Sequence, residues 1–290
     1  MADFLFDDIL PDTSKDEVLS SIAKISRTAL AVVKSLPKDS GVLAYSGGID
    51  SAIMASLILD RRNDIDLLTL GRAGSSDLLA SRESRVEFAK TEILFKTVEK
   101  SEIERAALRV AEIVSVTNLA HFEDCIAFWL IAERAKENGN TSYVVSANGP
   151  DELFCGYNRF RRLLDSEGYE AVEHEIIFAL SQAENLGSQV RVVLSHFGLG
   201  IFEPFLKEEF KKAALDIAIQ QKILKGNDLL RKRAWRCFGR SLGLRDEIVL
   251  RPKKAMQYGM GVHQVVKDMI KHGELGLEFS TKQSKIISSN

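Results

Sequence analysis

Residues 42–51 read VLAYSGGIDS, and this stretch decides the fold of the chain. Val42–Tyr45 is short, apolar and preceded by a glycine, which is typical of a buried strand. Ser46–Asp50 is a loop of small residues, and Ser51–Leu59 is apolar nearly all round, as expected of a helix that packs on a sheet. The stretch therefore predicts a strand, a tight loop and a helix in direct succession.

The alternation of strand and helix continues after this unit. Short apolar runs predict further strands, and helical spacing predicts the helices between them. The expected elements are strands at 66–70, 93–98 and 143–147 and helices at 77–90, 102–114 and 123–137. Strands separated by helices of this length pair in parallel through right-handed crossovers. We therefore expect an α/β fold with a doubly wound parallel sheet.

Helical patterns flank this core on both sides. Residues 14–36 predict an amphipathic helix, and no strand is predicted beyond about residue 160. Further helices are expected at 168–186, 205–224, 226–242 and 262–271. No Pro/Gly/Ser-rich linker interrupts the chain, so independently folded units are not expected. We expect a helical extension at 1–35 and one domain at 36–290, with an α/β core at about 36–160 and a C-terminal helical lobe at about 161–280.

The loop Ser46–Ser51 has the chemistry of a polyanion site. Its two glycines let the backbone turn tightly and bring N–H groups close to a ligand. The following helix presents unsatisfied N–H groups at the positive end of its dipole. Asp50 would repel bare phosphate, which points to Mg²⁺ between the two. An ordinary serine/glycine loop is the plain alternative, and the sequence is not that of a Walker A loop because no Gly-Lys-Ser/Thr follows.

SGGIDS resembles the PP-loop of the N-type ATP pyrophosphatases, which split ATP between its α and β phosphates. That superfamily includes asparagine synthetase, GMP synthetase, NAD synthetase and several tRNA-modifying enzymes. The resemblance implies an adenine nucleotide alpha-hydrolase-like fold. The loop alone does not choose among these enzymes.

A second segment makes the choice. Residues 146–157, SANGPDELFCGY, resemble the asparagine synthetase signature, an SGxGxDELFGGY-like run after a core strand. Since residues at the carboxyl ends of neighbouring strands face one crevice, Asp50 and Asp151 could share a Mg²⁺ that bridges the β and γ phosphates. The resemblance implies the same two roles. Asp151 followed by Glu152 also suits a helix N-cap and a first-turn acid, a use compatible with metal binding.

Three more stretches are similar to the asparagine synthetase family in order and spacing. Residues 70–77, LGRAGSSD, resemble its loop beside the adenosine. Residues 203–206, EPFL, resemble its PFLD step, with Lys207 in place of the aspartate. Residues 226–231 and 251–255 resemble its K-x-x-LR and R-x-K region. The resemblance covers most of 40–270 and makes 36–290 an asparagine synthetase-like ATP pyrophosphatase domain.

An adenylating site needs a cation where charge builds on the α-phosphate and the departing pyrophosphate. By its match to R-x-K, Lys253 is the residue that the resemblance implies for this task, beside Arg251. For the other basic residues of this region a solvated helical face is the preferred interpretation. These residues are Arg231, Lys232, Arg233 and Arg236.

The resemblance implies a full set of site residues. Lys253, Asp50 and Asp151 are the expected catalytic residues, and the two aspartates are the expected metal ligands. The acid substrate is expected beside Asn148, Glu152 and Tyr157. The residues expected to contact ATP are Ser46, Gly47, Gly48, Asp50, Ser51, Leu70, Gly71, Ser146, Ala147, Gly149 and Lys253.

The sequence departs from the family at several positions. Asn148 stands where the asparagine-forming enzymes carry an acid, and it cannot take a proton from ammonium as a carboxylate would. Pro150 and Cys155 replace small residues, and Cys155 is expected to be packed rather than nucleophilic. Residue 2 is Ala2, where the family's glutaminase half exposes a cysteine, so free ammonia or a separate glutaminase subunit is the expected nitrogen source.

One further polar cluster precedes an expected helix. His121, Glu123 and Asp124 lie where a helix N-terminus should approach the crevice. They could bind the acid substrate, but the preferred interpretation is a surface capping cluster.

The composition of the whole chain is that of a globular protein. The 290 residues carry a formal net charge of -2, which demands no nucleic-acid or membrane partner. Three dispersed cysteines without a CxxC pair favour free thiols in a reducing cytosol. The acidic N-terminus is not that of a signal peptide, and no apolar run reaches the ~20 residues that span a bilayer. We expect a cytoplasmic protein, and its oligomeric state is not indicated.

These observations favour an ATP-dependent amide ligase that uses Mg²⁺, adenylates a small carboxylic acid and transfers it to ammonia. L-Aspartate is the default acid by resemblance, and another small acid is the close alternative. A tRNA-modifying relative is less favoured, because neither paired cysteines nor a basic charge is present. A regulatory nucleotide-binding protein is favoured by the altered signature and opposed by the intact loop, Asp151 and Lys253.

Overall fold

Five short strands form a parallel sheet in the computed structural model, which describes residues 6–11, 13–88, 91–137, 139–226, 228–252 and 256–275. The strands are β1 (Gly41–Ala44), β2 (Ile65–Gly71), β3 (Ile93–Thr97), β4 (Tyr143–Val145) and β5 (Gly200–Phe202). Their order is β3-β2-β1-β4-β5, and each neighbouring pair is parallel. The expected doubly wound α/β fold is confirmed.

The direction of winding reverses between β1 and β4. The chain moves from β1 outward through β2 to β3, and later from β4 outward to β5. Gly41 of β1 pairs with Ile65 on one side and with Tyr143 on the other. In open α/β sheets, ligands bind outside the carboxyl ends of the strands at such a switch point. The loops that follow β1 and β4 are therefore placed at the position where a ligand is expected.

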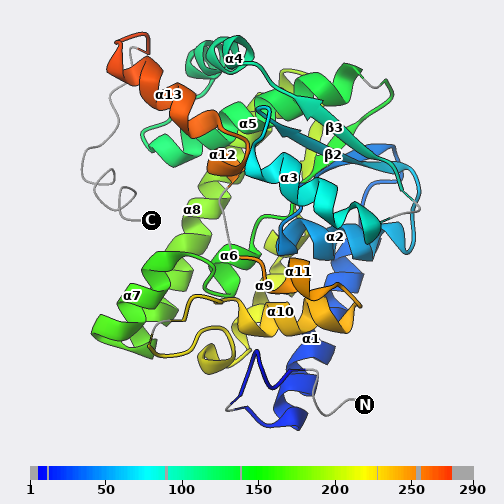
Figure 1. Cartoon of the computed structure of the whole chain (residues 1–290), viewed down its shortest axis with the longest axis vertical. Coiled ribbons are helices and arrows are strands. Elements are labelled where there is room, and N and C mark those ends of the chain that lie inside the picture. Colours follow the sequence, from blue (N-terminus) through cyan, green and yellow to red (C-terminus); the bar gives the residue numbers. More distant parts are fainter. Residues whose placement is uncertain are drawn as a thin grey trace.

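Helices make the crossovers and the flanking layers (Figure 1). Between the strands lie α2 (Ile49–Leu59), α3 (Ser76–Glu83), the 3-10 helix η1 (Ser84–Val86), α4 (Lys100–Ile113), α5 (Leu119–Glu137), α6 (Pro150–Leu153), α7 (Asn158–Glu167) and α8 (Tyr169–Ser195). After β5 come η2 (Pro204–Leu206), α9 (Glu208–Leu215), η3 (Ile219–Gln221), α10 (Arg233–Ser241), α11 (Asp246–Val249), α12 (Met256–Gly259) and α13 (Val262–Lys271). The N-terminal α1 (Lys15–Lys34) begins at a capping box in which Ser14 and Glu17 satisfy each other's backbone N–H groups.

The sheet has a hydrophobic core on each face. Successive side chains of a strand point to opposite faces, so Val42 joins one core and Leu43 the other. The core around Val42 includes residues of α4, α5 and α13, whereas the core around Leu43 includes residues of α1, α2 and α10. Figure 1 shows these two groups of helices on opposite sides of the strands.

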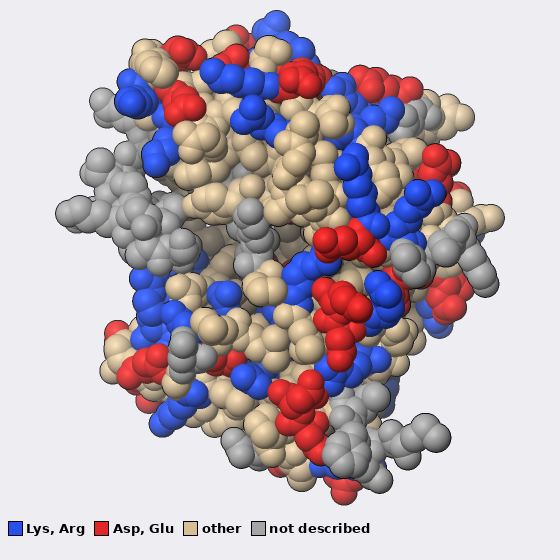
Figure 2. Space-filling model, viewed as in Figure 1, with Lys and Arg blue, Asp and Glu red and all other residues tan. Residues whose placement is uncertain are grey.

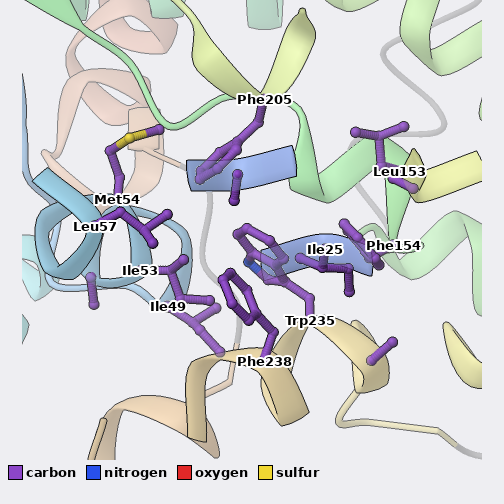
Figure 3. Packing of buried hydrophobic residues seen from close by; sticks show 14 of the residues in the cluster. Ile25, Ile49, Ile53, Met54, Leu57, Leu153, Phe154, Phe205, Trp235 and Phe238 are labelled. Carbon is purple, nitrogen blue, oxygen red and sulfur yellow. The ribbon is translucent and has the colours of Figure 1, made fainter. Parts of the chain in front are cut away.

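Trp235 of α10 is the centre of an aromatic cluster that includes Phe154, Phe205 and Phe238 (Figure 3). Its side chain is fully buried, and four phenylalanine rings lie with their centroids within 6 Å of its own. They are Phe154 at 5.2 Å, Phe205 at 4.9 Å, Phe210 at 5.9 Å and Phe238 at 5.4 Å. Aromatic pairs stabilise beyond the area that they bury. The cluster thereby ties α10 to the turns that follow β4 and β5.

Three sequence expectations about elements are corrected. The helix expected at 205–224 is divided into η2, α9 and η3. No strand was expected beyond about residue 160, but β5 extends the sheet to Phe202, and α8 belongs to a crossover within the α/β core. β5 begins with an exposed glycine and offers only two apolar residues, whereas the equally short β4 is a run of three buried apolar residues, so only β4 gives a detectable pattern. The helix expected at 226–242 begins only at Arg233, because Arg231 and Lys232 have φ of +51°. In the described part of the chain, no helix is both long and apolar enough to cross a membrane.

Replacing Phe238 by alanine tests the aromatic core. Because Phe238 is fully buried against Trp235, Phe238→Ala is expected to lower the free energy of unfolding by about 3–5 kcal/mol. Phe178→Ala is the matched control, since Phe178 is 53% exposed on α8 and its loss should change stability by less than about 0.5 kcal/mol. Urea denaturation of both variants gives the two values. Equal losses would contradict this placement of the core.

Candidate functional site

The loop after β1 is held in shape by its own serines. The Ser46 N–H donates to Ser51 Oγ at 3.2 Å, and Ser51 Oγ donates to the Gly48 carbonyl at 3.1 Å. Gly47 has φ of +72°, and a Cβ there would lie 2.5 Å from the backbone nitrogen of Ser81 in α3. Glycine is therefore required at that position. Within the described residues the Gly48 N-cap gives α2 no side-chain cap, and the positive end of the helix faces the loop.

The segment after β4 is packed against the turn after β5. The Ser146 N–H donates to the Phe202 carbonyl at 3.0 Å, and the Asn148 N–H donates to Ser146 Oγ at 3.2 Å. Gly149 has φ of +117°, and a Cβ there would lie 2.9 Å from the Phe205 carbonyl oxygen. This close approach fixes the direction in which α6 leaves the sheet, and with it the position of Asp151.

Asp50 and Asp151 meet at one buried cation. Lys232 Nζ lies 2.6 Å from Asp50 Oδ2 and 2.7 Å from Asp151 Oδ1, and its side chain is fully buried. Trp235 Nε1 donates to the other Asp50 oxygen at 2.8 Å. Burial alone would lower the pKa of Lys232, but the two carboxylates outweigh it and raise the pKa above its ordinary value. The structure thus brings together the two aspartates that the sequence predicted to share a metal, and it adds a lysine between them.

Asp50, Asp151 and Lys232 form an ion triad that leaves no room for a side chain at Gly156. A Cβ on Gly156 would lie 1.9 Å from Asp151 Oδ1 and 2.2 Å from Lys232 Cε. Arg231 Nη1 donates to the Gly156 carbonyl at 2.8 Å, which joins the segment before α10 to the 146–157 segment. The glycine before Tyr157 is therefore explained by the space that Asp151 and Lys232 need.

The interpretation of the basic residues as a solvated face is wrong for Lys232 and Arg236, which are 0% and 1% exposed. Arg236 Nε donates to the carbonyls of Leu230 and Arg231 at 3.0 and 2.8 Å. Arg233 Nε pairs with Asp228 Oδ2 at 2.9 Å. These cations satisfy backbone carbonyls and a buried carboxylate in the irregular stretch before α10. The tryptophan within the same run, at position 235, was the sequence signal that opposed a solvated face.

Leu70 and Gly71 end β2 beside the loop after β1. A Cβ on Gly71 would lie 2.1 Å from Ser75 Oγ, so a tight turn follows the strand. Leu70 lines a cavity of about 20 Å³ together with Ser46, Asp77 and Met260. This volume is about what one water molecule needs, so a nucleotide base would have to displace side chains there. The adenosine position stays a prediction.

The three residues expected at the acid substrate lie on the segment after β4 or in the helix that follows it. Asn148 Nδ2 donates to Oε1 of Glu203 at 3.4 Å, and Glu203 lies in the turn after β5. The Tyr157 hydroxyl donates to Glu152 Oε1 at 2.6 Å. Glu152 is 7% exposed, so this pair is shielded from water.

Lys253 lies outside the described residues, and its role stays a prediction. Arg251 of the same motif lies against the loop after β1. Its Nη1 donates to the Gly47 carbonyl at 2.9 Å, and its Nη2 pairs with Glu83 at 2.8 Å. The described chain just before Lys253 therefore contacts the predicted phosphate loop.

The interpretation of 121–124 as a surface capping cluster is wrong for two of its members. His121 is 8% and Glu123 2% exposed, and Glu123 Oε1 lies 2.8 Å from His263 Nδ1 of α13. The cap of α5 is Asn118, whose Oδ1 accepts the Ala120 N–H at 2.9 Å. For Cys155, packing is as expected, because its side chain is fully buried and burial raises the pKa of its thiol to about 12.

The donor set fits a Mg²⁺ that arrives with phosphates. Among the described residues no three His, Cys, Asp or Glu side chains gather as a metal site, and the two carboxylates that converge at the switch point are those of Asp50 and Asp151. Mg²⁺ is usually bound by one or two carboxylates, with phosphate oxygens and water completing its shell. Both carboxylates reach the same Lys232 nitrogen, so they already converge on one point.

One face of the molecule is hollowed. Figure 2 shows a hollow between the upper and lower halves of the molecule, with Lys and Arg side chains on its lower side. Elsewhere on this face charges of both signs are interspersed.

The asparagine synthase family model matches residues 31–198. The chain belongs to this family. The match includes both the loop after β1 and the 146–157 segment, so the asparagine synthase resemblance that the sequence predicted is confirmed.

Several asparagine synthase relatives are similar over most of this chain. A protein of Methanocaldococcus jannaschii assigned as a glutamine-hydrolysing asparagine synthetase is 28% identical over 85% of this chain and 50% of its own length. The glutamine-hydrolysing asparagine synthetase of Homo sapiens is 26% identical over 79% of this chain and 42% of its own length. The chain thus spans about half the length of these relatives or less. Among solved structures, the NH₃-dependent NAD synthetase of Campylobacter jejuni aligns with a TM-score of 0.33 at 18% identity, covering 73% of this chain and 99% of that one.

Lys232→Met tests the ion triad. It leaves two partly buried carboxylates facing each other without a cation, so the free energy of unfolding is expected to fall by about 3–5 kcal/mol at neutral pH. Because the pKa of Lys232 is raised, the ammonium's contribution is complete at neutral pH and is lost only as the pH rises through that pKa, above the ordinary 10.5. Mg²⁺ should recover part of the loss, since it neutralises the same pair.

Arg109→Met is the control, because Arg109 and its partner Glu112 are 60% and 61% exposed. Breaking that pair should cost less than about 1 kcal/mol and give no response to Mg²⁺. Urea denaturation with and without Mg²⁺ distinguishes the two variants. Wild-type stability of Lys232→Met would contradict the triad.

Proposed function

We propose that this protein is an ATP-dependent amide ligase that adenylates a small carboxylic acid, releases pyrophosphate and transfers the acyl group to ammonia. The observation that carries the proposal is the convergence of Asp50 and Asp151 at the switch point of the sheet, beside a serine/glycine loop that leads into the N-terminus of α2. Membership of the asparagine synthase family supports the same chemistry.

In this proposal, ATP lies across the carboxyl ends of β1, β2 and β4. The loop N–H and hydroxyl groups of 46–51 hold the phosphates, and Leu70–Gly71 lies beside the adenosine. Residues 146–149 form the other wall. Lys253 neutralises the α-phosphate. Mg²⁺, bound by Asp50 and Asp151, supplies charge neutralisation for the departing pyrophosphate.

The reaction has two steps. A carboxylate oxygen of the acid attacks the α-phosphorus. The bond between the α-phosphorus and the oxygen that bridges to the β-phosphate breaks, so pyrophosphate departs and acyl-AMP is formed. Ammonia then attacks the acyl carbon, the carbon–oxygen bond to AMP breaks, and the amide forms. The site must hold the carboxylate in line with the α-phosphorus and keep water from the acyl-AMP.

L-Aspartate is the default acid, and L-asparagine the default product. A different small acid is the second candidate. Asn148 favours this candidate, because the family carries a carboxylate at this position, whereas the amide of Asn148 donates a hydrogen bond to Glu203. Ammonia is free or supplied by a separate glutaminase subunit. Relatives that carry the name glutamine-hydrolysing are about twice as long as the segment that this chain matches.

Pyrophosphate release from Mg-ATP and ammonium tests the proposal, with L-aspartate measured beside a panel of other small carboxylic acids. Release that depends on one acid, with equimolar AMP and amide, is the expected result. ATP binding without acid-dependent pyrophosphate under any of these conditions would overturn the ligase and favour a regulatory role.

Asp50→Asn and Asp151→Asn should each lower pyrophosphate release about 100-fold or more, because a neutral amide cannot hold the cation at the phosphates. Lys253→Met should have a comparable effect on the same step. Asp60→Asn is the matched control, since Asp60 is an exposed carboxylate at the end of α2 and should leave the rate unchanged. A wild-type rate in Asp50→Asn and Asp151→Asn would refute the metal assignment, and a wild-type rate in Lys253→Met would refute its role at the α-phosphate.

A further inference from the structure

Glu203 presents a carboxylate at the edge of the site that the roles above do not use. It directly follows β5, as the 146–157 segment directly follows β4, so both lie at the same edge of the sheet. Its Oε1 accepts from Asn148 Nδ2 at 3.4 Å. The side chain therefore reaches from the outer strand to the predicted acid-binding segment.

The fold makes room for this carboxylate at some cost. Gly187 lies inside α8, where glycine destabilises a helix by about 1 kcal/mol relative to alanine. A Cβ on Gly187 would lie 2.7 Å from Glu203 Oε2. Any other residue there would push the carboxylate away from Asn148.

The surroundings leave the charge of Glu203 incompletely neutralised. Burial raises the pKa of its carboxyl, and the Asn148 amide, Arg191 of α8 and Lys207 after η2 oppose this only in part, so the pKa lies above its ordinary value. Glu203 makes no ion pair with any residue that the structure describes. It differs in this from Asp50 and Asp151, which share Lys232.

Amide formation needs a base at this place. When the nitrogen of ammonia bonds to the acyl carbon it becomes positively charged, and it must lose a proton to a base for the neutral amide to form. Asn148 cannot accept a proton, and the Glu152 carboxylate already accepts the Tyr157 hydroxyl. A partly buried carboxylate without an ion pair meets the requirement.

We propose that Glu203 is the proton acceptor of the amide-forming step, held in place by Asn148 and by the space at Gly187. The inference rests on the proposed function. One N–H bond of the attacking ammonia breaks and its proton passes to a Glu203 carboxylate oxygen, while its electron pair stays on nitrogen. The acyl carbon–oxygen bond then breaks, AMP departs with that oxygen, and Glu203 releases the proton to water.

Glu203→Gln separates this role from adenylation. With Mg-ATP and L-aspartate, or the acid of the panel that releases most pyrophosphate, ATP–pyrophosphate exchange should stay within a few-fold of wild type. Amide formation from ammonium should fall about 100-fold or more, the usual effect of losing a general base. Glu203→Asp should restore part of the rate, and Glu208→Gln, which removes an 86% exposed carboxylate on α9, should match wild type.

The pH profile gives a readout that a merely structural role would not move. With the rate expressed per free ammonia, wild type should lose amide formation as the pH falls through the raised pKa of Glu203, and Glu203→Gln should lack this limb. Equal loss of exchange and amide formation, an unchanged amide rate, or only a raised KM for the acid would overturn the proposal while the ligase stands. Absence of exchange in the wild type would instead overturn the ligase, and this role with it.

Discussion

The ammonium of Lys232 lies between two carboxylates that the fold would otherwise force to repel each other. Asp50 follows β1 and Asp151 follows β4. The two side chains meet because the parallel sheet places the ends of both strands at its switch point. Two carboxylates so close cannot both stay ionised without a cation. The lysine that supplies it is 182 residues from Asp50 in the sequence and reaches the site only because the chain before α10 adopts a left-handed conformation.

Many other features of the structure follow from this contact. Gly156 leaves room for the Asp151 carboxylate and the aliphatic part of the Lys232 side chain. The Gly156 carbonyl accepts a hydrogen bond from Arg231, the residue before Lys232. Trp235 uses its indole N–H on Asp50 and its rings on four phenylalanines, so one residue joins the ion triad to the core. A polar site held by such a rigid apolar support keeps its geometry before any ligand enters, which is what stabilisation of a developing charge requires.

The sequence predicted those parts of the structure that local patterns encode. The first four strands, the loop at 46–51 and the meeting of Asp50 with Asp151 follow from short apolar runs and from the geometry of parallel sheets. The fifth strand was missed because it begins with an exposed glycine and lacks the buried apolar run of the equally short β4, and Lys232 was missed because a basic run usually marks a solvated face. Glu203 was missed because it matters through its hydrogen bond with Asn148 and its close approach to Gly187. These three residues come from separate segments of the chain. Contacts of that kind are set by tertiary packing alone.

Attack of a carboxylate oxygen on the α-phosphorus is the central claim, and the fate of that oxygen tests it most directly. The protein would be given Mg-ATP, ammonium and a substrate acid labelled with ¹⁸O in its carboxylate, and the products analysed by mass spectrometry. The account predicts one labelled oxygen in AMP and none in pyrophosphate. Labelled inorganic phosphate formed together with ADP would show attack at the γ-phosphorus, and unlabelled AMP would show hydrolysis without acyl transfer; either result would contradict the account.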